Sequence, residues 1–160
     1  MPDLLLTIII QFVVAGLATF GFAIIFNAPR SESMLCGITG AIGWLVYYLL
    51  IHYADFNLVA SALIATGILT IFARILAVRR QNPVTLYLMT GIFPLVPGAG
   101  IYYTAYYLIT DDRSAFASKG TETLEIAIAI VFGIIFGTAI PQVLFHKLVR
   151  TKKGALQSLL

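Results

Sequence analysis

The stretch Pro94-Leu95-Val96-Pro97-Gly98-Ala99-Gly100 lies at the centre of an uncharged run that extends from residue 84 to residue 110. The 27 residues of this run exceed the roughly 20 that a helix needs to cross a bilayer. Proline lacks an N–H donor and disrupts the preceding helical turn, and glycine weakens a helix interior. The sequence therefore predicts a membrane-crossing helix broken near its middle, with half-helices at about 84–93 and 98–110.

Two interpretations of this break remain open at the level of sequence. Backbone groups released in hydrocarbon find no water, so such a break must be surrounded by protein or by a wet cavity. Broken helices of this kind form substrate sites in transporters, whereas a simple kink would only shape a packing surface. In the first interpretation, the substrate pathway comprises Pro94, Pro97, Gly98, Ala99, Gly100, Tyr102 and Tyr106. An interfacial aromatic belt is the alternative for the two tyrosines.

The composition excludes an ordinary soluble domain. The 160 residues are 60% hydrophobic and only 11% charged, and the mean hydropathy is +0.97. Five uncharged runs predict an all-α integral membrane protein with five transmembrane helices, the fourth of them broken. We expect one transmembrane domain over residues 1–160, with spans at about 4–26, 34–52, 57–78, 84–110 and 124–145 and a basic tail at 146–160.

The distribution of basic residues predicts an orientation. With a cytoplasmic C-terminus, eight of the ten lysines and arginines are cytoplasmic, and only Arg113 and Lys119 remain outside. Cytoplasmic loops are enriched in these residues, so we expect the N-terminus outside and the C-terminus inside, in a bacterial plasma (inner) membrane.

Small residues and one arginine mark further positions within the spans. Gly133 and Gly137 share one face of the last span, which is typical of a helix-packing surface. Arg74 lies near the end of the third span. It either extends to the cytoplasmic interface as an anchor or contributes to a cytoplasmic gate.

No motif of membrane enzyme chemistry is present, and the five uncharged runs contain no carboxylate. We therefore predict no enzyme activity, no cofactor, no metal site and no nucleic-acid partner. The environment that the sequence predicts is the lipid bilayer. We also expect no titratable residue at the depth of the break, so that any proton coupling would need a partner subunit.

Several segments together resemble a known family. They are Asn27-Ala28-Pro29-Arg30, Arg74 with residues 79–83, Gly91 to Gly98, and Ile140-Pro141. In order and spacing they are similar to the small five-helix component of the threonine/serine exporter (ThrE) family, which corresponds to the C-terminal half of the fused exporters. Asn27 and Arg30 join Arg74 as gate or anchor residues.

This resemblance implies half of a transporter, completed by a second five-helix subunit of the family or by a second copy. The expected substrate is a small carboxylate-bearing metabolite, either a threonine- or serine-type amino acid or a dicarboxylate such as succinate. If Pro97 lies in the first turn of the second half-helix, free N–H groups near Gly98, Ala99 and Gly100 would attract the carboxylate. A non-transporting assembly subunit and a homo-oligomeric channel are the alternatives.

Overall fold

The computed structural model describes residues 2–141, and this part of the chain is helical apart from short connections. The elements are α1 (Pro2–Ile25), α2 (Arg30–Tyr53), α3 (Leu58–Arg80), α4 (Val84–Gly91), the 3₁₀ turn η1 (Phe93–Leu95), α5 (Gly98–Ile109) and α6 (Arg113–Ala139). Helices α1, α2, α3 and α6 are long and apolar enough to cross a membrane. The segments Val84–Leu95 and Gly98–Ile109 form a pair bent by 54°. The predicted all-α fold with a broken fourth span is confirmed.

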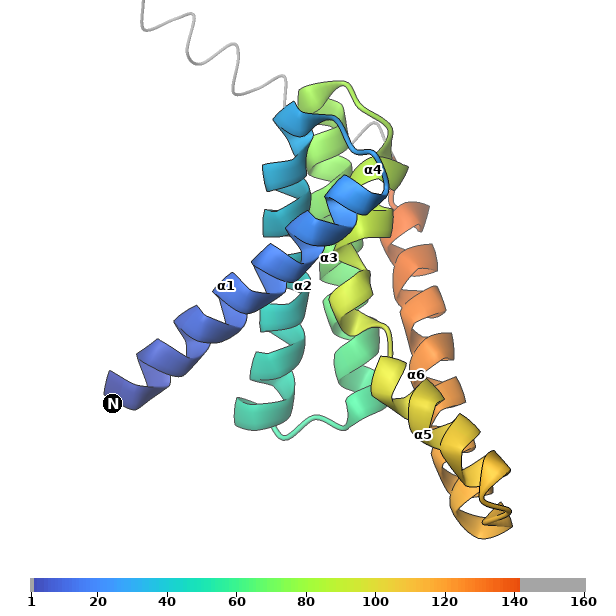
Figure 1. Cartoon of the computed structure of the whole chain (residues 1–160). Coiled ribbons are helices and arrows are strands. Elements are labelled where there is room, and N and C mark those ends of the chain that lie inside the picture. The colour runs from blue at the N-terminus through green and yellow to red at the C-terminus, as the bar shows by residue number, and fades with distance from the viewer. Residues whose placement is uncertain (1, 142–160) are drawn as a thin grey trace, which may run out of the picture.

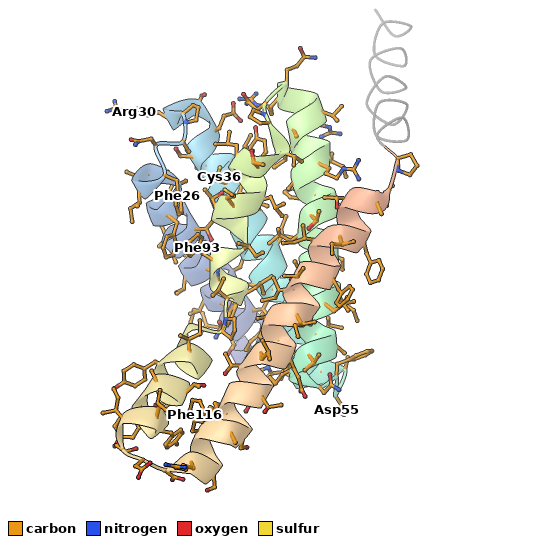
Figure 2. All side chains as sticks on the ribbon, turned by 90° about the vertical axis from the view of Figure 1, so that its right-hand side faces the viewer. Phe26, Arg30, Cys36, Asp55, Phe93 and Phe116 are labelled. Carbon is orange, nitrogen blue, oxygen red and sulfur yellow. The ribbon has the colours of Figure 1, made fainter. Side chains whose placement is uncertain are left out.

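Helices α2, α3 and α6 lie side by side, and α1 and α5 each pack mainly against one of them (Figure 1). Helix α3 packs between α2 and α6, and α5 runs along the N-terminal part of α6. Helix α1 packs on α2, but its N-terminal end points away from the other helices (Figure 1). The α5–α6 hairpin extends beyond the loop between α2 and α3 in both Figure 1 and Figure 2.

Small residues bring α3 and α6 into close contact. A Cβ added at Gly133 would lie 2.7 Å from the carbonyl oxygen of Leu63, and one at Gly137 would lie 2.6 Å from Thr70 Cβ. The hydroxyl of Thr70 donates to the Thr66 carbonyl within its own helix. The α3–α6 contact therefore depends on the close approach of two backbones, which replaces a hydrophobic driving force between helices in lipid.

Polar residues in the left-handed conformation end four helices. They are Asn27, Asp55, Gln81 and Asp111, with φ between 52° and 58°. At the end of α1, the N–H of Asn27 donates to Ile24 O and the N–H of Ala28 donates to Ala23 O, at 3.0 and 2.9 Å. This is the Schellman pattern, which satisfies the last carbonyls of a helix. Asn27 thus has an evident structural task at the α1–α2 turn.

The last helix begins earlier than the predicted span. Helix α6 starts at Arg113, eleven residues before residue 124, because the Asp112 side chain accepts a hydrogen bond from the Ala115 N–H and caps it. Charged residues end an uncharged run, but they do not end a helix. Residues 111–123, expected to connect the fourth and fifth spans, are therefore mostly helical. Residues 142–145 of the predicted span, and the tail at 146–160, lie outside the described residues.

Candidate substrate pathway at the broken helix

The break between η1 and α5 is built around Pro97. Its dihedral angles, φ −76° and ψ 62°, are those of an inverse γ-turn. The turn is closed by the Gly98 N–H, which donates to Val96 O at 2.7 Å. Pro97 thus directly precedes the first residue of α5. We expected Pro97 itself to lie in the first turn of this half-helix, so its position differs by one residue.

The γ-turn changes which N–H groups are available at the start of α5. The Gly98 N–H is used in the turn, and the Ile101 N–H donates to Pro97 O at 3.0 Å. Within residues 2–141, the N–H groups of Ala99 and Gly100 have no hydrogen-bond acceptor. Two of the three donors expected from the sequence therefore remain at this helix N-terminus.

Protein surrounds the break on two sides. The ring of Phe93, next to Pro94, stacks on Phe22 of α1 with centroids 4.2 Å apart, and lies 5.3 Å from Phe26. Figure 2 shows Phe26 and Phe93 on neighbouring elements. Leu95 is buried in a core cluster with residues of α3 and α6. The non-helical backbone is thereby shielded from lipid on these sides, as its unpaired groups require.

A cavity of about 350 Å³ opens at the break, and we call it the break cavity. One wall is the chain from Pro94 to Gly100, and the other walls include Trp44, Tyr47, Tyr103, Lys119, Glu122 and Thr123. The Trp44 Nε1–H donates to Gln11 Oε1 of α1 at 2.8 Å. The broken helix, α2, α6 and the first residue of α3, Leu58, contribute walls, and α1 holds one of the wall residues through Gln11.

The sequence-predicted pathway residues divide into two groups. Pro94, Pro97, Gly98, Ala99 and Gly100 line the break cavity. Tyr102 and Tyr106 are not among its lining residues, and their side chains are 65% and 49% exposed on the surface of α5. Tyr103, between them, lines the cavity instead.

The sequence interpretation missed two charged residues at the break. Lys119 and Glu122 line the break cavity, and Lys119 Nζ lies 2.9 Å from Glu122 Oε2. The expectation that no titratable residue lies beside the break is therefore wrong. It failed because these residues were assigned to a loop, whereas they belong to α6. The sequence signal that places them on a helix is the cap residue Asp112 before a stretch free of proline.

Arg74 has a defined place at the opposite end of the bundle. Its Nη1 group donates to the carbonyl oxygens of Gly137 and Thr138, at 2.8 and 2.9 Å. A cation is favourable there because a helix C-terminus carries partial negative charge. Arg74 also lines a second cavity of about 440 Å³, together with Gln81, Asn82 and Thr138. Asn27 and Arg30 lie at the α1–α2 turn and do not line this cavity.

A polar cluster around the buried Glu32 and Tyr87 lies at the same end and was not expected from the sequence, and the Arg80 side chain that joins it is 47% exposed. The Glu32 carboxylate accepts hydrogen bonds from Arg80 Nη2 at 2.8 Å and from the Tyr87 hydroxyl at 2.7 Å. Asn82 Nδ2 donates to the Tyr87 oxygen at 3.2 Å. Glu32 is 5% exposed and Tyr87 is fully buried. The cluster joins the start of α2, the end of α3 and the start of α4.

The comparison with known families agrees with this geometry. A family model described as "Threonine/Serine exporter, ThrE" matches residues 11–140, which include the break and both cavities. This chain belongs to the threonine/serine exporter family. It is thus a multi-pass membrane protein of a transporter family, which is not an enzyme family.

Two curated relatives extend this result. An uncharacterized protein of Haemophilus influenzae is 24% identical over 147 residues, covering 89% of this chain and 49% of the relative. A threonine/serine exporter of Corynebacterium glutamicum is 26% identical over 127 residues, covering 79% of this chain and 26% of the relative. The chain therefore spans about half the length of the first relative and a quarter of the second. No solved structure matches the chain.

Proposed function

We propose that this chain is one half of a two-component exporter, and that its substrate passes through the break cavity. The observation that carries the proposal is the broken helix, whose interruption lines a cavity in a member of an exporter family. The substrate is a small carboxylate-bearing metabolite, either a threonine- or serine-type amino acid or a dicarboxylate such as succinate. The second half is another five-helix subunit of the family or a second copy of this chain.

The length of the relatives supports the two-component arrangement. The chain covers at most about half of each relative that it matches. Transporters commonly expose their site alternately to the two sides of the membrane by moving one bundle against another. A single bundle with one broken helix supplies only one of the two moving parts.

The charges of the described residues support an N-out, C-in orientation in a bacterial plasma membrane. Arg30, Arg79 and Arg80 lie at the end of the bundle where α1 and α3 finish. Asp55, Asp111 and the exposed Glu125 lie toward the opposite end. We place the arginine-rich end in the cytoplasm, following the bias of cytoplasmic loops toward basic residues.

At the break, the N–H groups of Ala99 and Gly100 attract the substrate carboxylate. A helix N-terminus carries partial positive charge and unpaired donors, and both favour an anion. Gly98 allows the substrate to come close to the backbone, since a Cβ at this position would meet no protein atom within 4 Å. Open space beside the turn is what a bound molecule requires.

Two substitutions at the break test the proposal. Gly98→Val should abolish export and leave membrane insertion and assembly intact, because a Cβ at this position points into open space at the break. Pro97→Ala should let the helix re-form across the turn, with loss of export and a gain in thermal stability. Export of labelled threonine, serine and succinate is measured in the native host, with Gly21→Val as a control at another uncrowded glycine. If both break variants export normally, the chain is an assembly subunit.

Reconstitution tests the two-component arrangement. The purified chain in proteoliposomes, as a monomer, should not export these substrates, and addition of the partner membrane protein should restore saturable export. Saturable export by the monomer alone would refute the half-transporter proposal. Unsaturable flux through a self-associated chain would favour the channel alternative.

A further inference from the structure

The charges in the break cavity need an explanation beyond the stability of α6. Lys119 and Glu122 are three residues apart on one helix, with side chains 35% and 39% exposed. Such a pair contributes only a few tenths of a kcal/mol to a helix. The pair lies at the end of the bundle where α3 begins, because Leu58, the first residue of α3, lines the same cavity. Its place on the cavity wall, rather than a contribution to stability, points to a function there.

The contacts of the pair differ from those of the buried cluster around Glu32. Glu32 binds groups from α3 and α4, and so connects elements of the bundle. Within residues 2–141, the hydrogen bonds and ion pairs of Lys119 Nζ and the Glu122 carboxylate are only with each other. Opening this pair breaks no connection between helices, so the two groups are free to exchange partners with a bound molecule.

We propose that Lys119 and Glu122 select the transported molecule by its charges. This inference rests on the break cavity being the substrate pathway. Lys119, together with the N–H groups of Ala99 and Gly100, binds the carboxylate of the ligand, and Glu122 binds its ammonium group, so that one internal ion pair is exchanged for two pairs with the ligand. The cavity, with its balanced charges, fits a zwitterionic amino acid. A dicarboxylate leaves its second carboxylate facing Glu122, and this like-charge contact selects against it.

The position of the pair allows it to act at the break. A Cβ added at Gly100 would clash with the side chain of Thr123, the next residue after Glu122. A Cβ added at Gly120 would lie 3.3 Å from Thr104, so residues 119–123 of α6 run along the first two turns of α5, the first of which carries the N–H groups of Ala99 and Gly100. Glu125, one turn further along α6, is exposed and does not line the cavity. It provides a matched control on the same helix.

The test measures selectivity in the native host, where the partner of the chain is present. A strain lacking the gene is complemented with the wild-type chain, Glu122→Gln, Lys119→Gln or Glu125→Gln, and efflux of preloaded labelled threonine and succinate is recorded. We expect Glu122→Gln to lower threonine efflux at least about tenfold while succinate efflux appears or rises. Lys119→Gln should lower threonine efflux without raising succinate efflux, and Glu125→Gln should change neither. The succinate-to-threonine ratio does not depend on the amount of protein in the membrane.

The outcomes separate this inference from the proposed function. If Glu122→Gln exports both molecules in the wild-type ratio, or loses threonine export without exporting succinate, the proposed role of the pair in charge selectivity is wrong and the exporter proposal stands. If the wild-type chain exports no more of either molecule than the strain lacking the gene, the exporter proposal fails, and the inference fails with it.

Discussion

Gln81 ends α3 with φ at 58°, a left-handed conformation that side chains with a Cβ rarely adopt. Glycine carries no such steric cost. We expect Gln81→Gly to raise the free energy of unfolding by about 1 kcal/mol, measured by thermal unfolding in detergent. Asn27→Gly should gain less, because asparagine tolerates this conformation better. A lower unfolding midpoint for Gln81→Gly would contradict the helix-end assignment.

A second residue-scale prediction concerns Glu32. Its buried carboxylate accepts hydrogen bonds from Arg80 and Tyr87, so Glu32→Gln should lower the midpoint of thermal unfolding. Asp111→Asn is the matched control, since Asp111 pairs with Arg113 at 3.4 Å and both side chains are more than four-fifths exposed. Exposed pairs contribute little. Equal effects of the two substitutions would show that the buried cluster does not hold the three helices together.

The two kinds of site residue differ in how far the sequence reveals them. Pro97 and Gly98 break a helix through their own covalent structure, so their role is visible in the run that contains them. Glu32 lies 48 residues from Arg80 and 55 from Tyr87. No local pattern connects partners at such separations, and the cluster becomes visible only when the helices are placed side by side.

At the scale of elements, uncharged runs located the spans but not the helix ends. The predicted half-helices at 84–93 and 98–110 agree with α4 and α5 to within two residues. The start of α6 was missed by eleven residues because hydropathy reports contact with lipid, whereas helix length follows capping and backbone hydrogen bonds. Lys119 and Glu122 lie in this additional N-terminal part of α6, so uncharged runs alone could not place them beside the break cavity.

The α3–α6 contact yields an element-scale prediction. Gly137→Leu should lower stability by about 1–3 kcal/mol, as overpacking typically does, because any Cβ at this position meets Thr70. Gly21→Leu on α1 is the control, since a Cβ there meets nothing within 4 Å. Unfolding midpoints in detergent and yield of the folded chain report the difference. Unchanged stability of Gly137→Leu would place this face against lipid.

The orientation of the whole molecule is testable by labelling. Single cysteines at Ser114 and Ser158, in a background lacking Cys36, are exposed to a membrane-impermeant thiol reagent in intact cells. The eight-to-two division of basic residues predicts labelling at position 114 only. Permeabilised cells provide the control, in which both positions should react. Labelling of position 158 alone in intact cells would reverse the orientation.

The α5–α6 hairpin, which extends beyond the α2–α3 loop (Figure 1), has a consequence for the surrounding lipid. The 27 residues of α6 are about 40 Å long, against a hydrocarbon thickness of about 30 Å. The excess length carries Arg113, Lys119, Glu122 and Glu125, so it extends into the headgroup region and does not enlarge the hydrophobic surface. Headgroup charge therefore acts on this hairpin, and through α5 on the turn at Pro97.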